Sequence, residues 1–336
     1  MTKRVNPTIV EVAQRAGVSK SLVSLALRGA PHVSEASRQA ILEAAAELGY
    51  RPNAVARSLV SQRSFILGVM VSDLSNPFFT EVVEGVEEAA LAAEYRALII
   101  TGRRRPQRES VALNTLLELR TDGLILAGTV VADEEVEEAG RAVPTVLATR
   151  TIRSSVVDNV VNDDRLGAMM AVEHLVGLGH RRIAHISGGT GAGAQRRAKG
   201  YGDAMRHHGL AAEVTVAEGS YTESGGADGA RQLLAAARPP TAIFAPNDLA
   251  ALGALHTLES AGLQVPGDVS LVGYDDIALA GYKHIDLTTI HQPQREMGRR
   301  AVELLLERIE QGRTSPRRIV TKPKLVVRST TGPVAT

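Results

Sequence analysis

The first fifty residues carry apolar positions at helical spacing, interrupted by short polar turns. Those of the first predicted helix recur at intervals of three and four residues: Ile9, Val12, Ala13 and Ala16. Thr8 and Glu11 fit a capping box at the start of this helix. Gly17 supplies a turn in which a positive φ is tolerated, and Ser19 is a good N-cap for a second helix. The pattern predicts two short helices joined by a tight turn.

This arrangement is typical of a helix-turn-helix, which places its second helix in the DNA major groove, although any small helical hairpin could show it. A third helix is predicted from Ser34, another N-cap, to Gly49. Pro52 stops it, because the residue before a proline avoids the helical region. Asn53 can cap a fourth helix that is too short to be stable alone in water. We expect residues 52–63 to fold on docking to a partner, and to be a poorly ordered linker in its absence.

From Ser64 onward, apolar strand-like runs alternate with amphipathic helical segments. The strand-like runs are 66–71, 97–100, 123–127, 145–147, 156–161, 182–186, 214–217, 242–245 and 269–274. The helical segments are 80–93, 111–119, 166–177, 195–208, 226–237 and 249–261. This alternation predicts an α/β fold of parallel sheets covered by helices, and its two successive sets predict two similar lobes. Ligands in such folds bind at the carboxyl ends of strands, here most simply between the lobes.

The charge distribution separates the N-terminal region from the rest. Residues 1–63 hold nine Lys or Arg against four Asp or Glu, whereas the remaining residues hold 29 against 33. A basic region of this kind is expected where a protein contacts nucleic-acid phosphates. The length of 336 residues predicts two or three domains.

Other classes of protein find little support in the composition. The chain has no cysteine, which leaves no disulfide framework and no thiolate metal site. No apolar run reaches the length of a membrane span, and the N-terminus lacks the apolar stretch of a secretory signal. No nucleophile–base constellation and no His pair with zinc spacing is present. We therefore expect a cytoplasmic protein that is not an enzyme and holds no metal or cofactor.

Sequence motifs along nearly the whole chain resemble the LacI/GalR family of bacterial transcriptional regulators, in particular its ribose- and purine-type repressors. The N-terminal motifs are EVA at 11–13, AGVS at 16–19, VS at 23–24, HVS at 32–34, SR at 37–38, LGY at 48–50 and PNAVARSL at 52–59. The later motifs are SNPFF at 75–79, GHRRI at 179–183, RAKGY at 197–201, ND at 247–248, VPGDVSLVGYDD at 265–276 and LTTIHQP at 287–293. Glu11 departs from the family pattern, which has Asp there.

The resemblance implies a division of the chain. Residues 1–51 would form an all-α helix-turn-helix head, residues 52–63 a hinge helix or linker, and residues 64–336 an effector-binding and dimerisation core. The core would be a two-lobed, periplasmic-binding-protein-like structure with three crossovers between the lobes. Lobe one would comprise about 64–161 and 293–322, and lobe two about 162–292 and 323–336.

The resemblance also implies which residues contact DNA. They are Thr8, Ser19, Lys20, Ser21, Leu22, Ser24, Leu25, Arg28, His32, Tyr50, Asn53, Ala56, Arg57 and Leu59. Lys20 is the best candidate for a guanine contact, whereas Leu25 departs from the usual polar residue and can touch a thymine methyl. Leu59 matches a leucine that family members insert into the minor groove, which kinks the DNA; the alternative is a linker residue that packs on the core.

The predicted effector site lies between the lobes. Its candidates are Asp73, Asn76, Phe78 and Phe79 from lobe one, Asp163, Arg197, Phe244, Asn247 and Asp275 from lobe two, and Gln292 from a crossover. Carboxylates, amides and an arginine suit a polyhydroxylated ligand, because each hydroxyl both donates and accepts a hydrogen bond. The three phenylalanines would either sandwich a base or pack in the core.

Two loops are unusual. Arg103–Arg105 would be either a solvated basic loop or the site of a phosphorylated or carboxylated effector. The glycine-rich loop Gly188–Gly193 lacks the Lys-Ser/Thr of a phosphate-binding P-loop, which favours a flexible lid or connection.

The predicted function is that of a homodimeric repressor that binds a pseudo-palindromic operator and is switched by a small molecule. The predicted effector is a sugar, a polyol or a phosphorylated derivative. Two alternatives remain open at this point. One is a purine-type regulator that depends on a corepressor, and the other is a cytoplasmic small-molecule sensor that binds no operator.

Overall fold

The computed structural model describes residues 7–27, 30–50 and 63–334. The chain divides into two compact units, residues 1–64 and residues 65–336. Five predicted DNA contacts lie outside the described residues, together with almost all of the predicted hinge: Arg28, Asn53, Ala56, Arg57 and Leu59. Among the described residues, no helix is long and apolar enough to cross a membrane.

The N-terminal unit contains the three helices that the sequence predicts: α1 (Ile9–Arg15), α2 (Lys20–Leu27) and α3 (Glu35–Leu48). The capping box is present, because the backbone N–H of Thr8 donates to Glu11 Oε2 over 2.6 Å and the N–H of Glu11 donates to Thr8 Oγ1 over 3.4 Å. Gly17 adopts a φ of +66°, which sets the turn before α2. The unit has a small core of its own: Val12, Ala13, Val23, Ala26, Val33, Ile41, Ala44 and Ala45.

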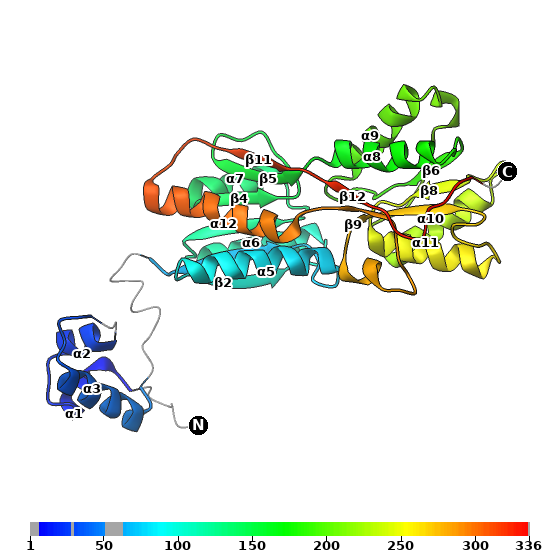
Figure 1. The fold of residues 1–336 in the computed structure, drawn as a ribbon. Helices are drawn as coiled ribbons and strands as arrows, with labels where there is room; N and C mark the ends of the chain where they lie inside the picture. The colour runs from blue at the N-terminus through cyan, green and yellow to red at the C-terminus, as the bar shows by residue number, and fades with distance from the viewer. Residues whose placement is uncertain (1–6, 28–29, 51–62, 335–336) are drawn as a thin grey trace. The chain divides into compact units, whose positions relative to one another are not determined.

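The larger unit consists of two lobes, each built on a six-stranded sheet (Figure 1). The lobe-one sheet has the order β11-β5-β4-β3-β1-β2, and the lobe-two sheet has the order β12-β10-β9-β8-β6-β7. The strands of lobe one are β1 (Ile66–Val71), β2 (Arg96–Thr101), β3 (Gly123–Ala127), β4 (Thr145–Ala148), β5 (Val157–Asn162) and β11 (Arg318–Thr321). Those of lobe two are β6 (Ile183–Ile186), β7 (Thr215–Ala217), β8 (Ala242–Phe244), β9 (Ser270–Asp275), β10 (Thr289–His291) and β12 (Lys324–Val326).

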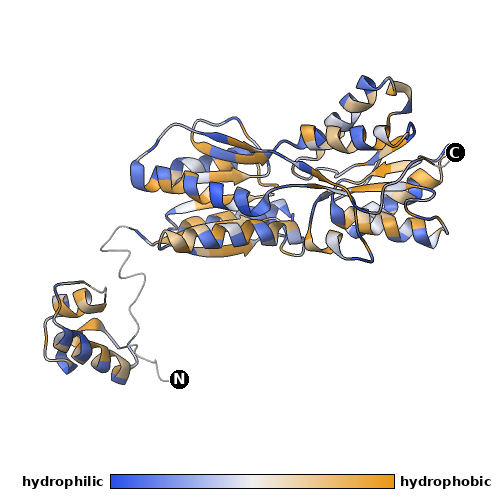
Figure 2. Ribbon diagram, viewed as in Figure 1, coloured by the Kyte–Doolittle hydropathy of each residue, from blue (hydrophilic) through white to orange (hydrophobic). Residues whose placement is uncertain are grey.

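Helices cover the sheets and turn their apolar sides inward. Lobe one carries α5 (Pro77–Ala92), α6 (Pro106–Glu118), α7 (Asp133–Ala142) and α12 (Gln294–Gln311). Lobe two carries α8 (Asp164–Gly177), α9 (Ala194–His207), α10 (Glu223–Leu234), α11 (Asp248–Ser260) and the short 3₁₀ helices η1 (Ala211–Glu213) and η2 (Ala278–Gly281). Figure 2 shows mostly hydrophobic strands beneath helices of mixed hydropathy. Every strand and helix predicted for this unit is present, whereas α7, α12, β10, β11 and β12 lie in segments for which no strand or helix was predicted.

The chain passes between the lobes three times, after β5, after β10 and after β11. The prediction of parallel sheets is wrong for one strand, because β12 pairs antiparallel with β10. Only residues 322–323 separate β11 from β12, and the chain runs almost straight from one lobe into the other (Figure 1). The carboxyl ends of the parallel strands in both sheets face the same space. A straight strand that runs parallel to β5 therefore continues antiparallel to β10.

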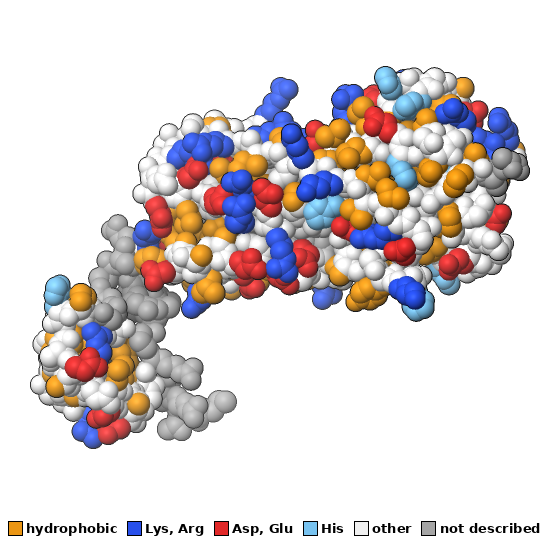
Figure 3. All heavy atoms as spheres, in the orientation of Figure 1, with side chains coloured by type: hydrophobic (Ala, Val, Ile, Leu, Met, Phe, Trp, Pro, Cys, Tyr) orange, Lys and Arg blue, Asp and Glu red, His pale blue; other side chains and the backbone are white. Residues whose placement is uncertain are grey.

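The last helix of the core packs closely along the first. A Cβ on Gly85 of α5 would lie 2.1 Å from the carbonyl oxygen of Arg295, and one on Gly298 of α12 would lie 2.1 Å from that of Val82. Glycine at both positions therefore allows the two backbones to approach. Acidic and basic side chains alternate over the outer face of these helices (Figure 3), where the Arg295 guanidinium pairs with carboxylates of α5 such as Glu88 at 3.0 Å.

Candidate functional site

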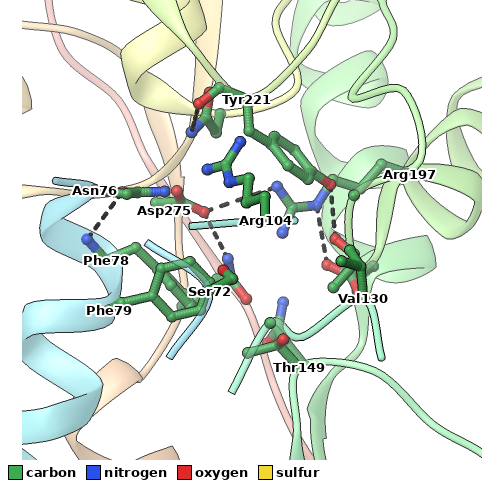
Figure 4. A pocket seen from close by; sticks show the side chains of 17 residues that line it. Ser72, Asn76, Phe78, Phe79, Arg104, Val130, Thr149, Arg197, Tyr221 and Asp275 are labelled. Carbon is green, nitrogen blue, oxygen red and sulfur yellow. Dashed lines mark hydrogen bonds and ion pairs between the residues drawn. The ribbon is translucent and has the colours of Figure 1, made fainter. Parts of the chain in front are cut away.

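A pocket that is partly open to solvent lies between the lobes at the carboxyl ends of the strands (Figure 4). Seven of the ten predicted effector-binding residues line it: Asn76, Phe78, Phe79, Arg197, Asn247, Asp275 and Gln292. They come from five separate stretches of the sequence. The fold thus brings together side chains that are far apart along the chain.

The other three predicted residues do not line this pocket. Asp73 Oδ1 accepts hydrogen bonds from the N–H and the hydroxyl of Ser75, at 3.0 and 2.6 Å. Asp163 caps α8 by accepting the N–H of Leu166 over 3.1 Å, and the next residue, Asp164, faces the pocket instead. Phe244 is fully buried in the core of lobe two and stacks on His185, with 4.8 Å between ring centroids. For Phe244 the structure corresponds to the core-packing interpretation.

Arg197 organises the charges on the lobe-two wall. Its Nε donates to Asp164 Oδ1 over 3.0 Å, and its Nη1 lies 3.7 Å from Asp275 Oδ1. Nη1 also donates to the carbonyl oxygen of Pro246, and the guanidinium lies 3.7 Å from the ring centroid of Tyr274. Burial by itself would lower the pKa of Arg197, but electrostatic interactions raise it above its ordinary value, the largest with Tyr221 and then with Asp164, Tyr274 and Asp275. The side chain is therefore a fixed cation.

Asp275 ends β9 with an unusual backbone. Its φ is +114°, and its carboxylate accepts the amide N–H of Gln292 over 2.6 Å. Burial raises the pKa of Asp275 to about 7, against the opposing effect of Arg197. The pKa of Asp248, buried close behind it, is also raised by burial and by the negative charge of Asp275. A non-glycine residue in this conformation at the wall of a pocket is typical of a binding site.

Tyr221 explains the glycine-rich loop. Its hydroxyl donates to the carbonyl oxygen of Ala192 over 2.8 Å, so that the loop rests against the ring. A Cβ on Gly188 would lie 2.7 Å from the ring, and one on Gly191 would lie 2.3 Å from it. The loop is rich in glycine because it packs on an aromatic ring at the pocket wall. No sequence pattern had indicated Tyr221.

Lobe one supplies aromatic and uncharged polar groups to the pocket, apart from one arginine. Asn76 caps α5 by accepting the N–H of Phe78 over 3.0 Å, and the rings of Phe78 and Phe79 meet edge to face at 5.1 Å. Gly128, with a φ of +69°, leaves room for Phe79, because a Cβ there would come within 2.3 Å of the ring. Arg104 extends into the centre of the pocket (Figure 4).

One pocket residue, Arg104, belongs to the loop Arg103–Arg105, which the sequence left open as the site of a phosphorylated or carboxylated effector. Nine others were not among the predicted effector contacts: Ser72, Gly128, Val130, Thr149, Asn162, Asp164, Gly191, Ala192 and Tyr221. Four of them lie at, or directly after, the carboxyl end of a lobe-one strand: Ser72, Gly128, Thr149 and Asn162. The rule that ligands bind at strand ends could have found these four. Among the described residues, no three His, Asp or Glu side chains form a group that could hold a metal ion.

In the N-terminal unit, the predicted DNA contacts around α2 differ in exposure. Lys20, Ser21 and His32 are exposed, and Leu25 keeps 41% of its surface in solvent. Thr8 and Ser19 are also exposed, but their hydroxyls accept the backbone N–H groups of Glu11 and Leu22 as helix caps. Ser24 is partly buried. Leu22 and Tyr50 are partly buried and pack against the core of the unit.

Comparison with known proteins matches separate parts of the chain to two family models. Residues 8–53 match the family described as bacterial regulatory proteins, lacI family, and residues 172–331 match the periplasmic binding protein-like domain. The ribose operon repressor of Escherichia coli (strain K12) is 37% identical over 96% of the chain and 98% of that relative. The chain belongs to the LacI family. A second relative, the transcriptional repressor PurR of Photobacterium profundum, is 34% identical over 96% of the chain and 97% of its own length.

Two solved structures of LacI-family proteins are similar in fold. The lac repressor dimer bound to operator and the anti-inducer ONPF is 29% identical, with a TM-score of 0.86 over 98% of the chain and all of that protein. A LacI-family regulator from Enterococcus faecium with bound ribose is 27% identical, with a TM-score of 0.74 over 80% of the chain and all of that protein. The resemblance inferred from the motifs is thereby confirmed, as is the predicted fold class of a helical head and a two-lobed α/β core.

Proposed function

We propose that this LacI-family chain is a transcriptional repressor. It binds a pseudo-palindromic operator as a homodimer and responds to a small molecule held between the lobes of its core. In this proposal it acts in the cytoplasm and catalyses no reaction. The observation that carries the proposal is the presence, in one chain, of a helix-turn-helix whose second helix exposes Lys20 and Ser21 and of a pocket lined by groups that hold polar ligands.

The N-terminal unit supports DNA binding by its geometry and its charge. Lys20 and Ser21 begin α2 and are exposed, which is where a recognition helix contacts base edges. Gly17 and the cap at Ser19 fix the start of that helix. A two-fold dimer would place two such helices on successive major grooves and thus recognise a pseudo-palindrome.

The pocket supports a sugar or a related polyol as the effector. Asp275, Asp164 and Asn247 offer acceptors, while Arg197 and the amides offer donors. Aromatic rings from both lobes, Phe79 and Tyr221, provide apolar surface for ring carbons. The similarity to a ribose operon repressor and to a ribose-bound regulator favours this class of ligand over a purine.

Contacts between the lobes support a coupling between effector binding and the arrangement of the lobes. The Asn162 amide of lobe one donates to the hydroxyl of Tyr274 over 2.9 Å, and Arg196 of lobe two donates to the hydroxyl of Thr151. A ligand that touches both walls would favour one arrangement of the lobes. The switch requires that the effector bind the DNA-competent and the DNA-free states with different affinity.

Selection of bound sequences from a random duplex library tests the proposal. The full chain is used at near-physiological salt, so that non-specific phosphate attraction is screened. We expect enrichment of a palindrome. We also expect the affinity for the enriched duplex to change, in either direction, when a metabolite extract is added. The Lys20→Glu variant, which reverses one exposed charge outside the core of the head, is the matched control and should enrich nothing. A wild-type chain that enriches no sequence with or without the extract would refute repressor function.

A further inference from the structure

The two walls of the pocket differ in the state of their charged groups. On the lobe-two wall, Arg197 and Asp164 form a buried ion pair at 3.0 Å, and Asp275 lies 3.7 Å from the same guanidinium. On the lobe-one wall, the charged residue among the described lining is Arg104. One wall therefore carries a paired cation, and the other presents a separate positive charge to whatever the pocket holds.

Arg104 has a long ion pair with Asp73 in its own lobe, and its charge partly offsets the rise in the pKa of Glu109 that burial causes. Its Nε lies 3.8 Å from Asp73 Oδ2, which is beyond hydrogen-bond distance, and both side chains are 27% exposed. Such a pair is weak. Asp73 is also engaged elsewhere, because its other oxygen accepts two hydrogen bonds from Ser75. The guanidinium is thus able to donate to a ligand anion in a forked arrangement.

The loop that carries Arg104 is built rather than loose. Arg103 and Arg104 both adopt positive φ values, +52° and +55°, which non-glycine residues rarely do in succession. The N–H of Arg104 donates to the carbonyl oxygen of Ser72 over 3.1 Å, which fastens the loop to the end of β1. Behind the loop, Gly102 packs so tightly against Glu109 that a Cβ would lie 2.1 Å from its Cγ. This geometry holds Arg104 at the pocket.

Thr149 adds an unsatisfied group to the same wall. It follows β4, has a φ of +74° and lines the pocket. Its Oγ1 is buried and has no hydrogen-bond partner among the described residues. A buried hydroxyl without a partner is costly, and a ligand oxygen would satisfy it.

We propose that the effector is an anionic sugar, whose phosphate or carboxylate is bound by Arg104 and Thr149 on lobe one while its hydroxyls are bound by the acidic and amide groups of lobe two. This inference rests on the proposed function only in taking the pocket as the effector site. The relatives whose names mention ribose suggest a neutral sugar, whereas this inference names an anionic one.

Calorimetric titration of the full-length protein tests the inference. The probes are ribose, ribose 5-phosphate and ribonate, with glucose, glucose 6-phosphate and gluconate as a second series, all at constant ionic strength. We expect an anionic member to bind at least about tenfold more tightly than its neutral parent, the effect of one charge-assisted hydrogen-bonded contact. The phosphate and carboxylate arms identify which anion is preferred.

The Arg104→Met variant should bring that affinity ratio close to one. The matched control is Arg105→Met, which removes an exposed charge from the same loop outside the described pocket lining. It should keep the preference. A neutral parent that binds as tightly as its anionic derivatives would overturn the inference. An Arg105→Met variant that loses the preference as fully as Arg104→Met would do so as well.

If no sugar of either series binds, inorganic phosphate is the probe. Millimolar phosphate should raise the melting temperature of the wild-type protein and of Arg105→Met, but not that of Arg104→Met. Equal melting temperatures with and without phosphate would then reject the inference. DNA binding does not enter these measurements. A chain that binds sugar phosphates but no palindrome would refute the repressor proposal alone, whereas one that binds a palindrome and only neutral sugars would refute the anion site alone.

Discussion

The second helix of the head and the pocket of the core place polar side chains in opposite settings. On α2, Lys20 and Ser21 are exposed and stand outside the core of their unit. In the pocket, Arg197 and Asp275 are 5% and 3% exposed. Arg197 forms an ion pair with Asp164, and Asp275 accepts a hydrogen bond from Gln292. Substitution of a polar side chain therefore has different structural consequences in the two settings. A change on the helix should alter recognition alone, whereas a change in the pocket should alter both binding and folding.

The largest expected effect is that of Arg197→Met. Methionine keeps much of the volume but leaves Asp164 and Asp275 buried without their cation, which costs about 3–5 kcal/mol when one partner of a buried pair is removed. Urea unfolding of the ligand-free chain measures it. The control is Arg165→Met in the same lobe, whose guanidinium pairs with Asp203 at 2.7 Å while 53% exposed. That exchange should cost no more than about 1 kcal/mol. Equal losses in the two variants would contradict the comparison.

A smaller effect, on binding only, is expected for Lys20→Ala. Because Lys20 is exposed at the start of α2, its removal should leave the free energy of unfolding within about 0.5 kcal/mol of wild type. Operator affinity should fall by about 1–3 kcal/mol, with discrimination relaxed at one base pair. Competition binding with single-base operator variants measures this.

Arg15→Ala is the control for Lys20→Ala, because it removes a charge from the same unit at the end of α1. Arg15 pairs with Glu47 at 2.6 Å, with both side chains more than half exposed. This variant should retain the base preference. If both variants weaken binding uniformly across all sequences, Lys20 contacts a phosphate and the base contact is wrong.

The head was predictable because its signals are local. A cap, a turn glycine and a helical repeat lie within twenty residues, and they fix both the helices and the face that is exposed. The core strands were predictable for the same reason, since buried parallel strands are short apolar runs. By contrast, β10 and α12 were not recognised, because three residues make a weak strand signal and α12 is highly charged along its outer face.

The pocket was only partly predictable because its geometry is not local. Phe244 sits at a strand end like the true lining residues, but the alternation of side chains along β8 turns it into the core beside His185. Asp163 and Asp164 are neighbours, and capping of α8 decides which of them faces the pocket. Tyr221 lies in the loop between β7 and α10, four residues past the end of the strand, and belongs to no motif. Its ring packs against the glycine-rich loop Gly188–Gly193, and the reason for the glycines in that loop is apparent only once the position of the ring is known.

The smallest expected effect concerns the pH dependence of stability, and it tests whether the pocket carries electrostatic strain that the head lacks. In the folded chain burial raises the pKa of Asp275 to about 7, whereas an unfolded aspartate titrates near about 4. The folded state therefore binds more protons between these values. Its free energy of unfolding should fall as the pH rises, by about 1 kcal/mol between pH 6.5 and 8 from this group. Urea unfolding of the ligand-free protein across that range measures the slope.

The Asp275→Asn variant removes this contribution, together with the part of the rise in the pKa of Asp248 that the Asp275 charge causes, and it keeps an acceptor for Gln292. Its slope between pH 6.5 and 8 should be shallower than that of the wild-type protein. Burial lowers the pKa values of His174, His180 and His185, and these histidines are present in both proteins, so they contribute equally to both slopes. Identical slopes would mean that Asp275 remains ionised in the free pocket. The attraction of the Arg197 guanidinium would then offset the effect of burial on the Asp275 carboxylate, and the pocket would carry no more electrostatic strain than the solvent-exposed charges of the head.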